Sequence, residues 1–366
     1  EKLMRIRDGI KLNFDDVLLV PQRSTLKSRK DVVLDREFQF YHSPKKLVCK
    51  PIFSSNMYAT GSMQIGRELA KENMLTCLHK FYTREELVSF FSEDDKYKEF
   101  VFVSIGQSMK DVDKIVELGF EPNIRIDVAN GNREEFVDFC KTVRVLFPNS
   151  IIGAGNVCTS EMTQELIIHG KADIIFLGIG PGSQCETRKL TGCGYPQLST
   201  IMECASVAHG LKSADKKIGL VCGDGGCKTV GDVCKGFGAG ADFIMLGGFF
   251  AGADECLGEW VEDTMLGMSD YTLDKDSKPV FYSTPSIKYN KRLKFYGMSS
   301  LEAQNNHNGG MEDYRASEGK VSEIPYKGPI SGLIKELLGG IRSSCTYIGS
   351  TGLKDFSKCT EFVRVK

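Results

Sequence analysis

One cysteine lies in a glycine-rich stretch whose composition suits nucleophilic chemistry. The stretch covers residues 178–196, GIGPGSQCETRKLTGCGYP, and contains Cys185 with Thr187 two positions later. A run so rich in glycine does not continue a helix or a strand, so we predict a loop. The apolar residues 174–177, IIFL, predict a short buried strand that leads into it. A thiol on such a loop is a candidate nucleophile, and the alternative is a structural turn with a buried cysteine.

The composition restricts the classes of function. The chain has 366 residues, 41% of them hydrophobic, and a formal net charge of −1, which argues against nucleic acid or an anionic membrane as the main partner. The 13 cysteines are scattered without a CxxC pair, and the five histidines show no zinc-binding spacing. Residues 1–7 are charged, and no apolar run has the length of a membrane span. We therefore expect a protein of the reducing cytosol.

A regular alternation along the chain predicts the elements that position the cysteine. Short apolar runs occur at residues 51–57, 75–80, 100–106, 124–131, 151–157, 174–182, 218–226 and 243–248. Amphipathic stretches with helical spacing separate them, at residues 61–73, 84–91, 111–118, 133–146, 160–169, 197–208 and 230–237. The repeat is about 25 residues, which accommodates a strand, a helix and two turns. Eight such units predict a (β/α)8 barrel, an α/β fold with one closed parallel sheet.

In this fold the active site lies at the C-terminal ends of the strands. The polar residues expected to face that mouth are Ser54, Ser55, Asn56, Lys80, Ser104, Asp127, Asn130, Asn156, Cys185 and Asp224. The seventh and eighth strands end in GDGG and LGG, at residues 223–226 and 246–248. Paired glycines there predict a phosphate site, with close helix packing as the alternative. Asp224 would repel a phosphate, and a ribose hydroxyl is a better partner for its carboxylate.

The remaining segments surround a single predicted domain, residues 1–366. Residues 1–50 form an N-terminal extension, in which residues 12–30 are expected to be an extended, solvated cap. The polar, turn-rich residues 258–293 predict a hairpin excursion or lid. The closing helix, residues 331–338, is expected to end at Gly339-Gly340 and to leave a C-terminal tail at residues 341–366.

Several motifs together resemble a known family. These are GIGPGSQCETR, TGCGYPQLS, DGGC, FGAGADFIMLGG, FYGMSS and YRASEGK, and the chain that carries them is similar to the IMP dehydrogenase/GMP reductase family, most closely to its reductase branch. The similarity extends from FDDVLLVPQRSTLKSR to TEFVRV. Residues 82–100 stand where the dehydrogenases carry an inserted regulatory module, so no such module is expected.

The resemblance implies reductive deamination of GMP to IMP with NADPH as cofactor and release of ammonia. A thiolate of Cys185 would add to purine C2 and form a covalent thioimidate, which divides one difficult substitution into two easier steps. Thr187 and Glu318 match the residues that handle protons in the reductases. A homotetramer is implied in the same way.

The resemblance also assigns binding residues. GMP would contact Asp224, Gly225, Gly226, Gly247, Gly248, Gly297, Met298, Ser299, Arg315, Ala316, Ser317, Glu318 and Gly319. NADPH would contact Ser28, Arg29, Lys80, Asp127, Val128, Ala129, Ile179 and Gly180, and a neighbouring subunit would add Met298, Tyr314, Arg315, Ser343, Ser344, Cys345 and Thr346. A monovalent cation, K⁺, would bind loop carbonyls of Gly180, Gly182, Cys185 and Arg188.

The sequence departs from the family pattern at a few points. Glu186 stands where threonine is common, and an inward orientation would raise the pKa of Cys185, so we expect it to face outward in an extended loop. Leu301 replaces a common acidic residue, and the excursion before FYGMSS is longer than is typical. Two alternatives stay open: an IMP dehydrogenase, although Tyr314-Arg315 reverses the order of its Arg-Tyr pair, and a catalytically silent purine-nucleotide-binding homologue.

Overall fold

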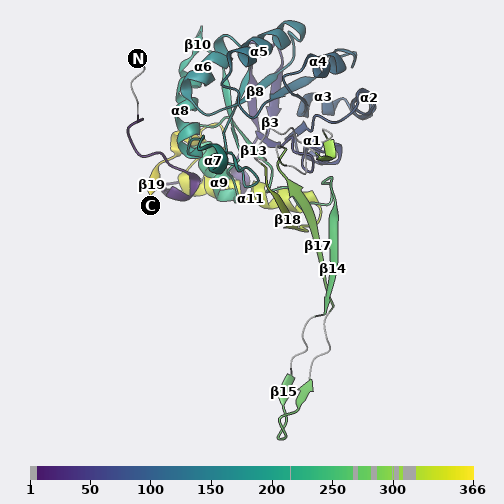
Figure 1. Ribbon diagram of the computed structural model, residues 1–366. Coiled ribbons are helices and arrows are strands. Elements are labelled where there is room, and N and C mark those ends of the chain that lie inside the picture. The colour runs from purple at the N-terminus through teal and green to yellow at the C-terminus, as the bar shows by residue number, and fades with distance from the viewer. Residues whose placement is uncertain are drawn as a thin grey trace.

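Eight parallel strands form a closed barrel in the computed structural model, which describes residues 6–214, 216–266, 271–281, 287–298, 300, 305–307 and 319–366. The order around the barrel is β12-β13-β4-β5-β6-β7-β8-β9, so the predicted (β/α)8 fold is confirmed (Figure 1). The strands are β4 (Ile52–Ser54), β5 (Leu75–Leu78), β6 (Val101–Ile105), β7 (Asn123–Asp127), β8 (Ile152–Val157), β9 (Ile174–Leu177), β12 (Leu220–Asp224) and β13 (Phe243–Leu246).

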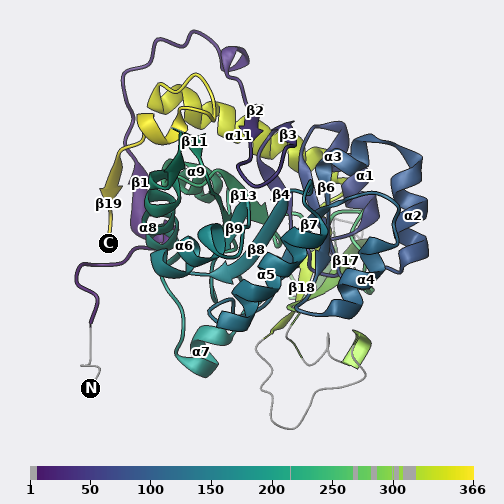
Figure 2. The ribbon, with the colours of Figure 1, turned by 90° about the horizontal axis from the view of Figure 1, so that it is seen from above.

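Helices surround the barrel, and several begin at a side chain that caps them (Figure 2). The hydroxyls of Ser62, Thr83, Thr159 and Thr229 each accept a backbone N–H in the first turn of the helix that follows. The helices are α1 (Met63–Lys71), α2 (Arg84–Glu93), α3 (Lys96–Phe100), α4 (Met109–Val116), α5 (Glu134–Leu146), α6 (Ser160–Ile168), α8 (Gln197–Gly210) and α9 (Val230–Gly238). Only α2 and α3 lie between β5 and β6, as expected for a chain without the regulatory module.

The interior of the barrel is filled by aromatic side chains. The ring centroid of Phe53 lies 5.1 Å from that of Phe102 and 5.6 Å from those of Phe176 and Phe243. All four rings are fully buried, because the barrel strands are apolar on both faces. The barrel is therefore a packed core, and its open space lies at the mouth.

The N-terminal extension is more ordered than the sequence predicted. Strand β1 (Val17–Leu19) pairs antiparallel with β19 (Phe362–Arg364), so a segment near the start of the chain lies beside the last strand. Phe14, in the 3-10 helix η1 (Phe14–Asp16), and Val17 are buried, which contradicts the expected solvated cap. Farther on, β2 (Arg36–Gln39) and β3 (Lys46–Cys49) form a hairpin, and η2 (Arg29–Asp31) precedes it.

The closing helix is longer than predicted. Helix α11 (Ile330–Ile348) continues through Gly339 and Gly340, so the expected end at these glycines is wrong and the tail begins after the helix, with η3 (Phe356–Cys359) and β19. A Cβ at Gly340 would lie 2.5 Å from the Val230 side chain of α9. The glycine therefore permits two helices to approach closely, and the helix ends only at Gly349, whose φ is +72°.

Antiparallel strand pairs occupy the described part of the excursion, for which a hairpin or a lid was expected. Strand β14 (Trp260–Leu266) pairs antiparallel with β17 (Ile287–Tyr296), which also pairs with β18 (Val321–Pro325). Figure 1 shows β14 and β17 leaving the barrel together. Two further pairs are β15 (Tyr271–Leu273) with β16 (Pro279–Phe281), and β10 (Lys212–Ser213) with β11 (Lys216–Lys217). None of the helices in the described parts of the chain has the length and apolar character needed to span a bilayer.

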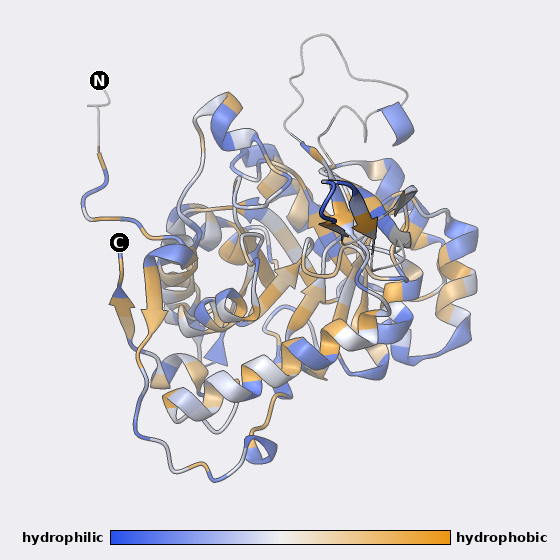
Figure 3. Ribbon diagram, turned by 90° about the horizontal axis from the view of Figure 1, so that it is seen from below, coloured by the Kyte–Doolittle hydropathy of each residue, from blue (hydrophilic) through white to orange (hydrophobic). Residues whose placement is uncertain are grey.

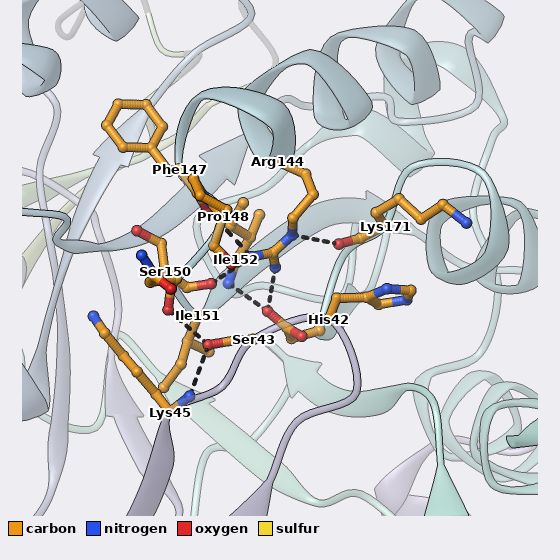
Figure 4. Close-up of polar contacts among 12 residues, drawn as sticks. His42, Ser43, Lys45, Arg144, Phe147, Pro148, Ser150, Ile151, Ile152 and Lys171 are labelled. Atoms are coloured by element: carbon orange, nitrogen blue, oxygen red, sulfur yellow. Dashed lines mark hydrogen bonds and ion pairs between the residues drawn. The ribbon is translucent and has the colours of Figure 1, made fainter. Parts of the chain in front are cut away.

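A buried ion pair between Arg144 and Asp173 lies at the starts of two barrel strands, and Figure 4 shows the polar contacts of Arg144. The guanidinium of Arg144, on α5, donates to the Asp173 carboxylate and to the carbonyls of Ser150 and Lys171. Asp173 immediately precedes β9 and also accepts the N–H of Ile152, the first residue of β8. Burial raises the pKa of Asp173 to about 6, although Arg144 opposes this shift. The pair joins one helix to the starts of two strands.

His42, which lies beside this ion pair, predicts acid sensitivity. Burial, aided by the Arg144 charge, lowers its pKa to about 4, and its Nε2 lies 3.0 Å from the Ile167 carbonyl oxygen. The unfolded histidine titrates near 6.5, so between about pH 6.5 and pH 4 the unfolded chain binds the extra proton and folding stability falls as pH falls. Asp173, whose pKa is raised to about 6, contributes a slope of opposite sign in both proteins. The free energy of unfolding in urea should therefore fall toward acid less steeply in His42→Gln than in the parent, by up to about 1.4 kcal/mol per pH unit in this range. Parallel stability curves for the two proteins would contradict this.

Candidate active site

A cavity of about 370 Å³ opens at the C-terminal ends of the barrel strands. It brings together many residues that the sequence analysis assigned to a site: Asp127, Gly182, Cys185, Asp224, Gly225, Gly226, Gly247, Gly248, Gly297, Met298 and Gly319. Several lining residues were not assigned a binding role there: Ser55, Asn56, Met57, Pro181, Ser183, Gln184, Cys227, Lys228, Met245, Phe249, Phe295 and Ile324. The cysteine loop and the two glycine pairs therefore line one cavity, as the barrel prediction required, and they adjoin each other: a Cβ at Gly225 would lie 3.2 Å from the Pro181 side chain.

Cys185 lies on the cavity wall with a hydroxyl beside its sulfur. Its Sγ donates a hydrogen bond to Thr187 Oγ1 over 3.1 Å, and its backbone N–H donates to the Gly182 carbonyl over 3.1 Å. A threonine hydroxyl accepts from a thiol and donates to a thiolate, so this contact serves both protonation states of the sulfur. The thiol is half-buried, whereas Cys49, Cys77 and many of the other cysteines are fully buried.

The segment after Cys185 is helical, which corrects the prediction of a continuous loop. Helix α7 (Thr187–Thr191) begins directly after Glu186, whose carbonyl accepts the N–H groups of Lys189 and Leu190, and it ends at Gly192 with φ +71°. The Glu186 carboxylate lies 3.0 Å from the Lys189 ammonium, and Glu186 does not line the cavity. Its outward orientation is confirmed, but the reason is the helix and not an extended loop.

A segment from far along the chain closes over the cysteine loop. Gly319 forms an antiparallel β-bridge with Cys185, and the N–H of Lys320 donates to the Gln184 carbonyl over 2.8 Å. A Cβ at Gly319 would lie 2.4 Å from the Ser300 nitrogen, so glycine is needed at this approach. The residue that follows Glu318 therefore lies beside Cys185. Six assigned residues fall outside the described residues: Ser299, Tyr314, Arg315, Ala316, Ser317 and Glu318.

The part of the cavity formed by the two glycine pairs, beside Pro181–Ser183 of the cysteine loop, suits an anion. Gly225 and Gly226 have φ of +84° and +89°, a conformation in which glycine exposes backbone N–H groups. Gly247 and Gly248 follow β13, the strand next to β12, and Ser183 and Lys228 line the same cavity. Lys228 went unrecognised in the sequence, although it follows the GDGGC motif directly.

Two carboxylates that line the cavity, at the predicted strand ends, are each hydrogen-bonded by an amide, and of the two amides only Asn56 lines the cavity itself. The Asn156 side chain donates to Asp224 Oδ2 over 2.9 Å, and the Asn56 side chain donates to Asp127 Oδ2 over 3.0 Å. Burial raises the pKa of Asp224, whereas Arg125 and the Asn156 hydrogen bond lower it. Arg125 was missed in the sequence, although a charged residue inside the apolar run NIRIDV is a signal.

Other residues assigned to the cofactor do not line this cavity within one chain: Ser28, Arg29, Lys80, Val128, Ala129, Ile179, Gly180, Ser343, Ser344, Cys345 and Thr346. Ser28 caps η2, and Ser343–Thr346 belong to α11, which approaches η2 through a hydrogen bond from Arg342 to the Val32 carbonyl. These two groups thus lie on one side of the molecule. Asp127 and Met298 are the assigned cofactor residues that the structure brings to the cavity among those it describes.

Some groups of the residues assigned to a cation already form hydrogen bonds within the chain. The Arg188 guanidinium donates to the carbonyls of Ile179 and Tyr195 over 3.2 and 2.5 Å. The Gly182 carbonyl accepts the Cys185 N–H, and the Arg188 carbonyl accepts the Gly192 N–H. Among the residues that the structure describes, no three His, Cys, Asp or Glu side chains gather as metal ligands.

The sequence matches a family model described as "IMP dehydrogenase / GMP reductase domain" at residues 11–271 and 282–366. The chain belongs to the IMP dehydrogenase/GMP reductase family. The family resemblance is thereby confirmed. The family match omits residues 272–281, which fall in the β15–β16 hairpin, and this agrees with an excursion longer than is typical.

Relatives within the family cover almost the whole chain. A protein named GMP reductase from Phytophthora infestans is 48% identical over 365 residues, which are 99% of this chain and 92% of the relative. A GMP reductase from Buchnera aphidicola subsp. Schizaphis graminum is 47% identical over 367 residues, or 99% and 96% of the two chains. A GMP reductase from Aeromonas hydrophila is 45% identical over 368 residues, or 99% and 97%.

Proposed function

We propose that this protein is a GMP reductase, which converts GMP to IMP with NADPH as the reductant. Relatives of that name match nearly all of the chain at 45–48% identity. The observation that carries the proposal is the hydrogen-bonded pair of Cys185 and Thr187 on a cavity that two glycine pairs also line, where a phosphate could bind. A nucleophile and an anion site in one cavity are what covalent chemistry on a nucleotide base requires.

The walls of the cavity suggest how GMP binds. The phosphate would lie against the backbone N–H groups of Gly225-Gly226 and Gly247-Gly248, and Asp224 would accept a hydrogen bond from a ribose hydroxyl. This orientation directs the purine toward Cys185, between Met298 and Gly319. The family pattern adds Gly297, Ser299, Arg315, Ala316, Ser317 and Glu318 to the substrate contacts.

The proposed reaction divides into two steps. The Cys185 thiolate bonds to C2 of GMP while Glu318, with Thr187, delivers a proton to the departing amine, so the C2–N bond breaks and a thioimidate remains. NADPH supplies the hydride that reduces C2 when it is bound. The C2–S bond then breaks and returns the thiolate. The balance is GMP + NADPH + 2H⁺ → IMP + NADP⁺ + NH₄⁺, which is the interconversion of purine nucleotides in salvage.

The cofactor and cation residues fit this proposal in part. The Asp127 side chain is 36% exposed, and its carboxylate suits a ribose hydroxyl of the cofactor. Neither Ser28-Arg29 nor Ser343–Thr346, however, lines the cavity of the same chain. We therefore include a homotetramer, in which a second copy completes the NADPH site. The carbonyls of Gly182 and Arg188 each accept one N–H and keep a second lone pair, so K⁺ is compatible with the loop. The reducing cytosol is the compartment proposed, because it keeps the thiol active.

Two reaction mixtures test the function. The purified protein is given GMP with NADPH, or IMP with NAD⁺, each in K⁺ and in Na⁺ buffer, and nucleotide absorbance and ammonia are followed. We expect loss of NADPH with an equal amount of ammonia in the first mixture, and a higher rate with K⁺. Turnover of IMP and NAD⁺ alone would identify a dehydrogenase, and inertness in both mixtures would favour the silent homologue.

A further inference from the structure

Arg125 occupies an unusual place for a charged side chain. It lies on β7 in the middle of the barrel, and its side chain is 0% exposed. The guanidinium carbon lies 3.9 Å from the centroid of the Phe176 ring on β9. Burial of a charge is costly unless its donors find partners, so the contacts of this group indicate what holds it.

The donors of Arg125 reach both carboxylates of the cavity floor. Its NH2 group donates to Asp127 Oδ1 over 2.9 Å and to Asn156 Oδ1 over 2.5 Å, and lies 3.6 Å from Asp224 Oδ2. The same Asn156 amide donates to Asp224 Oδ2 over 2.9 Å. One guanidinium thus contacts Asp127 directly and reaches Asp224 both by charge and through Asn156.

The two carboxylates have different assigned partners. Asp224 faces the nucleotide side of the cavity with 20% of its side chain exposed, and Asp127 lies on the side assigned to the cofactor. Two like charges beside one guanidinium oppose each other, and the cation offsets part of this repulsion. Arg125 also orients the Asp127 carboxylate through a direct hydrogen bond, and it orients Asp224 through Asn156, which it holds by another hydrogen bond.

We propose that Arg125 is the positioning residue of the cavity floor. Together with Asn156, it holds the Asp224 and Asp127 carboxylates in one hydrogen-bonded unit, and this unit fixes the positions of substrate and cofactor relative to each other. The inference rests on the proposed function for the identity of the two ligands. Arg125 itself does not line the cavity and acts through Asp224, Asp127 and Asn156.

The electrostatics of Asp224 provide a specific readout. Burial raises its pKa and Asp127 adds to that shift, whereas Arg125 and Asn156 lower it. The neighbouring thiols of Cys77, Cys222 and Cys227 have pKa values raised by burial, so they stay neutral as Asp224 titrates. Removal of the Arg125 charge should therefore raise the pKa of Asp224 further, and the ionised carboxylate needed for the ribose would be lost at a higher pH.

The test compares Arg125→Met and Arg125→Lys with the parent, in kcat/KM for GMP against pH and in calorimetric GMP binding over the same pH range. Arg125→Met should raise the KM for GMP about tenfold or more and move the acid limb of both profiles upward by about 1 to 3 pH units. Arg125→Lys keeps the positive charge, so its acid limb should lie close to that of the parent, whereas its KM for GMP should recover only in part.

The possible results distinguish the role of Arg125 from the proposed GMP reductase activity. If the parent turns over GMP but Arg125→Met keeps its KM and acid limb, the inference is wrong and the function stands. If the parent is inert but the acid limb of GMP binding shifts in Arg125→Met, the function fails and the inference stands. Should Arg125→Met not fold, Asn156→Ser decides, because it leaves the arginine in place and breaks the relay to Asp224. An unshifted limb in a folded Asn156→Ser protein would overturn the inference.

Discussion

Cys185→Ala is expected to lower kcat for GMP-dependent NADPH oxidation by at least about 10⁴-fold while GMP still binds. The substitution removes the sulfur that would bond to purine C2, and Thr187 cannot replace it because an unactivated hydroxyl is a far weaker nucleophile than a thiolate. The walls formed by Gly225-Gly226 and Gly247-Gly248 are unchanged, so GMP affinity should stay within about threefold. Stopped-flow absorbance measures the first quantity and calorimetry the second.

The same loop offers a matched control. Cys193 is exposed, lies eight residues after Cys185 and does not line the cavity among the residues described. Cys193→Ala should therefore keep the parent kcat and KM. Iodoacetamide should inactivate the parent and the Cys193→Ala protein alike, with GMP protecting both. A Cys185→Ala protein that kept a tenth of the parent activity would rule out covalent catalysis by this thiol.

Arg144→Met is expected to destabilise the fold by about 3–5 kcal/mol, because it leaves the Asp173 carboxylate buried without its cation. The Asp173 pKa, already raised to about 6, should rise further, so part of the loss would be relieved by protonation at acidic pH. Urea denaturation monitored by circular dichroism measures the change. The network lies away from the mouth, so the folded fraction should keep the parent kcat.

A double substitution and an exposed arginine separate charge from packing. Arg144→Met with Asp173→Asn removes both charges, and we expect it to recover about half or more of the lost stability. Arg84 also forms ion pairs, with Glu85 and Glu117, but its side chain is 45% exposed, so Arg84→Met should destabilise the fold far less than Arg144→Met. Equal losses for Arg84→Met and Arg144→Met would contradict a role for burial.

Local patterns in the sequence were sufficient to predict the barrel and the place of its site. Each of the eight strands is a short apolar run that ends in polar residues, and this signal depends only on neighbours in the chain. Because parallel strands of a barrel all point the same way, their ends had to meet at one mouth. The sequence pattern alone therefore predicts that Cys185, Asp127, Asp224 and the glycine pairs lie at one mouth, and all of them line one cavity.

Tertiary contacts decided the features that the local pattern misjudged. Helix α11 passes through Gly339-Gly340 because Gly340 packs against Val230, and burial between two helices outweighs the low helix propensity of glycine. The bridge between Gly319 and Cys185 joins positions more than a hundred residues apart, so no local signal could reveal it. Arg125 appeared in the sequence as one charge in an apolar strand, and only the barrel shows that it lies between two carboxylates and above a phenylalanine ring.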